Sequence, residues 1–209
     1  MTVIDPELLT FEYKLRYRGV PGMEHVPRDY PMRWEITVTT APETAGSTAG
    51  AEDSAQEGGG AEGEEVLVGN AVVQVVPKAG MINLFVTTDG ADPHMAQIAE
   101  MLTAERPDLV TEYLQDGGDL MIVSTLEILP EYRGGRMGYT VLHAIVETVG
   151  RSVDLVVVHA VPAASDGSPP EGSAEYEEAK ATLKAYWQDF GFEEAAGEYL
   201  AFAKKSLLE

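Results

Sequence analysis

Two arginines and three glycines lie within residues 133–138, "RGGRMG", between an apolar run and a helical pattern. A helix that begins directly after a strand offers unpaired backbone N–H groups and the positive end of its dipole. Glycines let an anion approach that backbone closely, and arginines add permanently charged, bidentate donors. The segment therefore predicts an anion site suited to a pyrophosphate. A glycine-rich turn with two surface arginines is the structural alternative.

Other common catalytic motifs are missing from the sequence. No Lys-Ser/Thr pair follows the glycines, as in a Walker loop, and their spacing differs from the dinucleotide-binding fingerprint. No Gly-x-Ser-x-Gly elbow of a serine hydrolase is present. The histidines show no metal-ligand spacing and the chain has no cysteine, so we expect neither a metal site nor disulfides. The histidines are His25, His94, His143 and His159.

The elements around this loop predict an α/β sandwich built on one mixed sheet. Alternating or continuous apolar patterns predict strands at residues 11–19, 32–40, 66–76, 119–129, 153–161 and 199–205, with a further candidate at 81–88. Helical spacing predicts helices at 92–102, 107–116, 137–150 and 173–190, the first with Asp92 as its N-cap. As a crossover, helix 137–150 would make the strands on either side of it parallel.

At 209 residues, the chain predicts a single domain spanning residues 1–209. Residues 41–65 are rich in Ala, Gly, Glu and Ser and lack any apolar period. We therefore expect a disordered acidic insertion between two strands. The Pro-, Ser- and Gly-rich residues 162–172 predict a flexible loop.

The charge is strongly acidic, with 35 acidic against 14 basic residues and a formal net charge of −21. Such a surface repels nucleic acids and anionic membranes and attracts cationic small molecules or basic peptides. Solubility or adaptation to salt is the alternative explanation. No apolar run is long enough to span a bilayer, and the N-terminus lacks the apolar region of a signal peptide. We expect a cytoplasmic protein.

Two stretches resemble motifs of the GNAT superfamily of acetyl-CoA-dependent N-acetyltransferases. "TLEILPEYRGGRMG" resembles motif A, a strand followed by Pro-x-x, Arg/Gln-x-x-Gly-x-Gly/Ala and a helix. "YWQDFGF" is similar to motif B, an aromatic residue followed by x-x-x-Gly-Phe. The longer pattern L-x-x-Y-W-x-x-x-G-F gives a closer likeness to GNAT-like proteins of actinobacteria. The resemblance covers residues 120–205. It implies a mostly antiparallel sheet flanked by helices, with one parallel strand pair that splays apart.

The resemblance also implies how acetyl-CoA, the acyl donor, would bind. Residues 133–138 would hold its pyrophosphate through backbone amides, and the strand edge near Ile128 would pair with its pantetheine amides. The thioester would enter between the strands around Ile128 and Val158. The implied cofactor-binding residues are Leu126, Ile128, Arg133, Gly134, Gly135, Arg136, Met137, Gly138 and Trp187. No metal is implied.

Three residues depart from the family pattern. Arg136 replaces the second glycine of the loop, although it keeps the backbone amide and adds a phosphate-binding side chain. Lys180 stands where the family often has asparagine. Trp187 stands where the family often has a tyrosine general acid, and an indole cannot give up a proton near neutral pH. The adjacent Tyr186 would point about 100° away on a helix.

Three residues are the catalytic candidates: Glu127, His159 and Tyr186. Glu127 lies among apolar residues beside the expected thioester position, where desolvation would raise its pKa and suit it to act as a general base. A paired or solvated carboxylate at the rim of the sheet is the alternative. His159, at the end of its strand, is a second base candidate, with a hydrogen-bonded structural histidine as the alternative.

Two functions follow from these features. The first is acetyl transfer from acetyl-CoA to a cationic amine, either a small molecule or a basic peptide. The second is a non-catalytic acyl-CoA-binding or regulatory module with the same fold. The sequence does not fix the acceptor, the acyl chain length or the oligomeric state, and it leaves a homodimer open.

Overall fold

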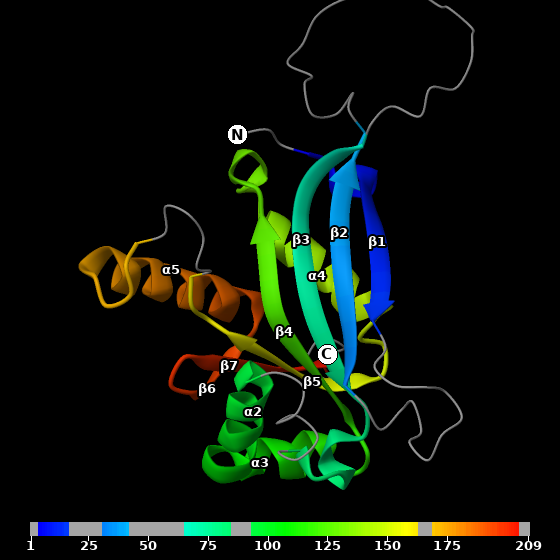
Figure 1. The fold of residues 1–209 in the computed structure, drawn as a ribbon, viewed down its shortest axis with the longest axis vertical. Helices are drawn as coiled ribbons and strands as arrows, with labels where there is room; N and C mark the ends of the chain where they lie inside the picture. The colour runs from blue at the N-terminus through cyan, green and yellow to red at the C-terminus, as the bar shows by residue number, and fades with distance from the viewer. Residues whose placement is uncertain (1–3, 17–30, 42–64, 85–92, 163–168, 205–209) are drawn as a thin grey trace, which may run out of the picture.

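One mixed sheet organises the chain (Figure 1). The computed structural model describes residues 4–16, 31–41, 65–84, 93–162 and 169–204. Within these ranges the sheet has seven strands in the order β1-β2-β3-β4-β5-β7-β6. They are β1 (Leu9–Arg16), β2 (Met32–Thr40), β3 (Val66–Val76), β4 (Asp119–Ile128), β5 (Val153–His159), β6 (Glu193–Ala196) and β7 (Tyr199–Ala203).

Helices cover the sheet on two faces. They are α2 (Pro93–Glu100), α3 (Pro107–Leu109), α4 (Met137–Thr148) and α5 (Ala174–Phe190). π-Helical turns extend α2 through Met101–Glu105 and α3 through Val110–Leu114. In Figure 1, α4 passes behind β3 and β4, whereas α2 and α3 lie in front of the lower end of the sheet. Each face has its own buried core, the first packed under α4 and the end of α5, the second under α2 and α3.

β4 is the central strand and joins the two halves of the sheet. Its residues from Leu120 to Val123 are at most 2% exposed, because both faces of the strand are covered. β4 pairs antiparallel with β3 and parallel with β5, and the other neighbouring strands described are antiparallel. α4 is the crossover between β4 and β5. The predicted mixed α/β fold with one parallel pair is confirmed.

Two features of the sheet differ from the sequence-based expectation. The candidate strand at residues 81–88 is wrong over its described part, because Met81 ends a 3-10 turn and residues 82–84 form no strand. Its apolar character serves the second core instead, where Leu84 is 4% exposed. β6 was not predicted, since "EEAA" contains no β-branched or aromatic residue. It forms as an edge strand through its pairing with β7.

Several sequence-based expectations concern residues outside the described ranges. The N-cap at Asp92, residues 163–168 of the 162–172 loop and most of the acidic insertion at 41–65 lie outside the described residues. Within those that are described, no helix is long and apolar enough to cross a membrane.

Candidate functional site

β4 and β5 run side by side for only part of their length. Their ladder ends where Val123 pairs with Val158, while β4 continues to Ile128. A register shift against β3 leaves Ser124 as an extra residue at the same point. Such a bulge bends a strand and increases its twist. The two strands therefore diverge beyond Val123 (Figure 1).

Beyond the end of the β4–β5 ladder, the last part of β4 has an open backbone edge on the side where β5 paired with it earlier. The N–H of Leu129 donates to the carbonyl of Val68 on β3 at 2.9 Å. Successive residues of a strand alternate in direction, so the backbone groups of Leu126 and Ile128 point the other way. The carbonyl of Ile128 accepts a hydrogen bond from Nε of Arg133 at 2.8 Å. The remaining groups of Leu126 and Ile128 on this edge have no strand partner among the described residues.

Residues 133–138, the glycine loop, carry the chain from β4 into α4. Three successive residues have positive φ, 112° at Gly134, 53° at Gly135 and 61° at Arg136. Glycine adopts this backbone freely, whereas arginine there costs about 1 kcal/mol. Within the described part of the chain, the amides of these three residues form no hydrogen bond. They lie at the start of a 12-residue helix, where unpaired N–H groups attract anions.

Both arginines of the glycine loop are engaged by neighbouring groups. Nη2 of Arg136 lies 2.9 Å from Oδ2 of Asp189 on α5, and its guanidinium lies 5.3 Å from the ring centre of Tyr139. The side chains of Arg136 and Asp189 are 70% and 60% exposed, so this ion pair contributes at most about 1 kcal/mol. A phosphate could displace it. Nε of Arg133 donates to the carbonyl of Ile128.

Tyr186 lies against the first turn of α4. A Cβ atom at Gly138 would come within 2.6 Å of its hydroxyl oxygen, so a larger residue there would force the Tyr186 side chain to shift. The hydroxyl of Tyr139 donates to the carbonyl of Tyr186 at 2.6 Å, and their rings are 4.3 Å apart. Burial raises the pKa of Tyr186 to about 12, while hydrogen bonds with the backbone of Tyr139 and Gly138 act in the opposite direction. The phenol therefore occupies space at the amides of this helix end.

Trp187 and Met137 belong to the first core. Trp187 is 4% exposed and packs edge-on against Phe190 and Phe192, with ring centres 6.3 and 5.9 Å away. Met137 is 6% exposed, and its amide donates to the carbonyl of Gly134 at 3.0 Å. Both side chains stabilise the packing of α4 and α5 beneath the glycine loop.

Glu127 lies on the open face of β4. Leu126 and Ile128 pack into the core under α4, so the alternation of a strand places Glu127 on the opposite face. Its register partner on β3 is the exposed Asn70. Glu127 is itself exposed and therefore lacks the desolvation expected from its apolar neighbours in sequence.

His159 ends β5 and is held in a polar and aromatic cluster. Its Nε2 lies 3.2 Å from one carboxylate oxygen of Glu198, whose other oxygen accepts from Nζ of Lys180 at 2.8 Å. The hydrogen bond from Lys180, joined by that to His159, lowers the pKa of Glu198 below its usual value despite an opposing effect of burial. The imidazole stacks on Tyr199, with centres 4.7 Å apart, and lies 5.1 Å from the ring of His94.

A cavity of about 510 Å³ opens beside this cluster, and we call it the hairpin cavity. One wall is α2 with its π-helical extension (residues 93–105), which we call the α2 segment, and the other is the turn between β6 and β7. His159 lies between the two walls. The remaining lining residues are Gln97, Glu100, Met101 and Glu105 on the helix side and residues 196–199 on the hairpin side.

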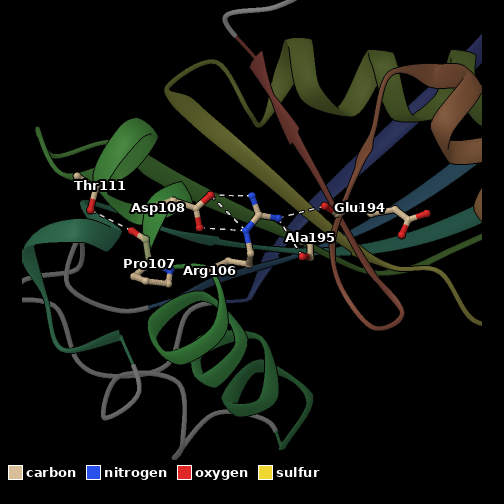
Figure 2. Close-up of polar contacts among 6 residues, drawn as sticks. All are labelled: Arg106, Pro107, Asp108, Thr111, Glu194 and Ala195. Atoms are coloured by element: carbon tan, nitrogen blue, oxygen red, sulfur yellow. Dashed lines mark hydrogen bonds and ion pairs between the residues drawn. The ribbon is translucent and has the colours of Figure 1, made fainter.

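Arg106 ties the two walls of the hairpin cavity together (Figure 2). Its Nε and Nη2 bind the carboxylate of Asp108, with Nη2 and Oδ2 2.7 Å apart. Its Nη1 donates to the carbonyls of Glu194 and Ala195 at 3.1 and 2.9 Å. Arg106 directly follows Glu105 of the helix wall, and Ala195 directly precedes the hairpin wall. The guanidinium therefore positions both walls.

His159 was a candidate from the sequence, but the groups that surround it were not. Glu198, Tyr199 and His94 come together only in the folded chain. Gly197, with φ 56°, marks the β6–β7 turn and could have indicated the hairpin. Among the described residues, no three His, Asp or Glu side chains are grouped to hold a metal ion. No protein-family model matches the chain, and no curated protein matches it.

Proposed function

We propose that the chain is an N-acetyltransferase that uses acetyl-CoA as donor and a cationic amine as acceptor, in keeping with its resemblance to the GNAT superfamily. The observation that carries the proposal is the divergence of β4 and β5 beyond Val123 and Val158. This opening exposes a strand edge that leads directly to the unpaired amides of the glycine loop.

The residues present fit the donor. The open edge at Leu126 and Ile128 would pair with the pantetheine amides. The amides of Gly134, Gly135 and Arg136 would bind the pyrophosphate. Acetyl-CoA supplies an activated acyl group and a thiol leaving group.

His159 is the better placed of the two candidate bases. Glu198 fixes the orientation of its ring, and the ring faces the hairpin cavity. Glu127 lies on the same face of the sheet, but no group of the described structure holds its carboxylate. We assign the proton from the amine to His159 and keep Glu127 as the second candidate.

The reaction needs little further assistance from the protein. The ammonium group first loses a proton to His159, and the neutral amine nitrogen then bonds to the acyl carbon as the carbon–sulfur bond breaks. The nitrogen gives up its second proton, and the departing thiolate takes up a proton. Trp187 is buried and Tyr186 has a raised pKa, so neither is an effective acid. Thiols ionise near pKa 8.5, so unassisted departure is tolerable. Positioning of the reactants would supply much of the rate.

The absence of cysteine makes the test direct, because a thiol reagent then reports only released CoA. The protein is incubated with acetyl-CoA and with polyamines, aminoglycosides or basic peptides, and the amide product is verified by mass spectrometry. We expect amine-dependent thiol release that His159→Gln lowers by about 10²- to 10⁴-fold without weakening acetyl-CoA binding. Glu127→Gln should have the smaller effect. No amine-dependent release with any acceptor would contradict an enzyme.

A non-catalytic acyl-CoA-binding or regulatory module is the second candidate, and the contacts of α5 favour it. The hydroxyl of Tyr186 lies at Gly138, and Asp189 pairs with Arg136, so α5 already contacts the proposed pyrophosphate site. Calorimetric binding of acetyl-CoA, together with no thiol release in the presence of any amine, would favour this function.

A further inference from the structure

The hairpin cavity carries negative charge that its neighbours do not neutralise. Glu198 on the hairpin wall is paired with Lys180 and His159. By contrast, Glu100 and Glu105 on the helix wall form no ion pair with any residue that the structure describes. Both carboxylates are exposed and so are available to a bound ligand.

Aromatic and amide groups complete the lining. The hydroxyl of Tyr199 donates to Oε1 of Gln97 at 3.2 Å, and its ring stacks on His159. Ring faces beside carboxylates attract organic cations. Burial raises the pKa of Tyr199, and the charges of Glu198 and Glu105 raise it further. The carboxylates of Glu198 and Glu105 therefore place negative charge near this ring.

The two walls also indicate the shape of the ligand. The α2 segment runs along the hairpin, since the ring of His94 lies 6.1 Å from that of Tyr199 at one end and Arg106 donates to the carbonyl of Ala195 at the other. With a helical rise of about 1.5 Å per residue, Glu100 lies about 9 Å beyond His94 along the axis. A linear ligand with positive charge at both ends matches this arrangement, and the cavity volume suits a small molecule.

We propose that the hairpin cavity binds a linear aliphatic diamine or polyamine, with one ammonium group at Glu100 and Glu105 and the other amine beside His159 and Tyr199. The role of this ligand as acyl acceptor rests on the proposed function. Its binding does not, because every contact named is present without the donor.

The test is calorimetric titration of the full chain, without acyl-CoA, using 1,4-diaminobutane and spermidine. 1,4-Butanediol is the uncharged control. We expect the amines to bind and the diol not to bind. Glu100→Gln and Glu105→Gln should each weaken amine binding about tenfold, as expected for loss of a charge-assisted contact. Glu178→Gln removes the same charge from an exposed position of α5 and should leave affinity near that of the wild type.

Four outcomes decide the proposal. No amine binding, or equal losses in all three variants, would overturn it, the latter because attraction would then be a property of the whole surface. Amine binding without any acetyl-CoA binding would support the cavity while removing the proposed function. Acetyl transfer that persists undiminished in Glu100→Gln and Glu105→Gln would support the function and overturn the cavity as its acceptor site.

Discussion

The glycine loop and the hairpin cavity lie beside the carboxyl ends of β4 and β5, and they differ in sign. The loop has unpaired amides, a helix N-terminus and two arginines that contact Asp189 and Ile128, whereas the cavity is lined by the carboxylates of Glu100, Glu105 and Glu198. An anionic donor and a cationic acceptor would thus each be attracted to a different side of the opening. Under the proposed function, one sheet would separate its two substrates by charge.

The two regions also differ in how fully the protein satisfies its own polar groups. Side chains of α5 already contact the loop through Tyr186 and Asp189. In the cavity, Glu100 and Glu105 have no basic partner in the described structure. We therefore expect ligand binding at the loop to compete with α5, and binding at the cavity to meet no such competition.

The largest expected effect concerns the packing that holds α5 over the loop. Trp187→Ala should lower the free energy of unfolding by about 3–5 kcal/mol, because it removes a side chain that is 4% exposed. Urea denaturation measures this loss, and Tyr186→Phe, which keeps the neighbouring ring, should cost about 1 kcal/mol or less. A loss below about 1 kcal/mol in Trp187→Ala would show that the indole is not part of the core.

The next effect concerns Arg106, which joins the two walls of the hairpin cavity. Arg106→Ala should cost about 2 kcal/mol of stability, because two carbonyls lose a charged donor. Arg106→Lys should recover only part of this, since an ammonium cannot reproduce the fork geometry. Urea denaturation measures both variants, with the exposed Arg151→Ala as a control expected within about 0.5 kcal/mol of the wild type. Equal stability of Arg106→Ala and the control would mean that Arg106 does not hold the two walls together.

A smaller effect distinguishes the backbone strain at Arg136 from the ion pair of its side chain. At φ 61°, Arg136→Gly relieves backbone strain but loses an exposed ion pair, whereas Arg136→Ala loses the pair and keeps the strain. The glycine variant should therefore be more stable than the alanine variant by about 1 kcal/mol. The same denaturation measurement decides this, and an alanine variant that is equally stable would contradict the left-handed conformation at this position.

The smallest effect is a pH dependence at the cavity. The pKa of Glu198 is lowered in the folded state, so its stabilising contribution is present above the unfolded pKa and disappears as pH falls through the folded one. The difference in melting temperature between wild type and Glu198→Gln should therefore shrink from pH 7 to pH 3. Glu178→Gln, which removes the same charge elsewhere, should show no comparable change. A difference that grows on acidification would contradict the pairing with Lys180.

Local patterns predicted most of the fold. β2, β3 and the start of α4 lie where their apolar periods placed them, and the crossover helix made the β4–β5 pair parallel. β6 escaped because its four residues lack strand character and its pairing comes from β7. Residues 81–84 form no strand, because the apolar Ile82 and Leu84 pack into the second core, and such side chains resemble those of a strand in sequence.

The two parts of the candidate site also differ in how far the sequence could predict them. The glycine loop is six consecutive residues, so its composition alone indicated an anion site. The hairpin cavity joins Gln97 to Tyr199 across 102 positions, and no local pattern connects them. The sequence placed Tyr186 and Trp187 on different sides of one helix. It could not show that the tryptophan enters the core while the tyrosine meets the first turn of α4.

Calorimetric titration of acetyl-CoA into Gly135→Asp and Gly135→Asn tests most directly whether the start of α4 binds acyl-CoA. A Cβ at Gly135 meets nothing within 4 Å, and both replacements tolerate its φ of 53°, so the two variants differ essentially in charge. If the amides of the glycine loop hold the pyrophosphate, the aspartate variant should bind about tenfold or more weakly than the asparagine variant, because the added carboxylate repels the phosphates. Equal affinities of the two variants, or no binding to the wild type, would contradict an acyl-CoA site at the start of α4.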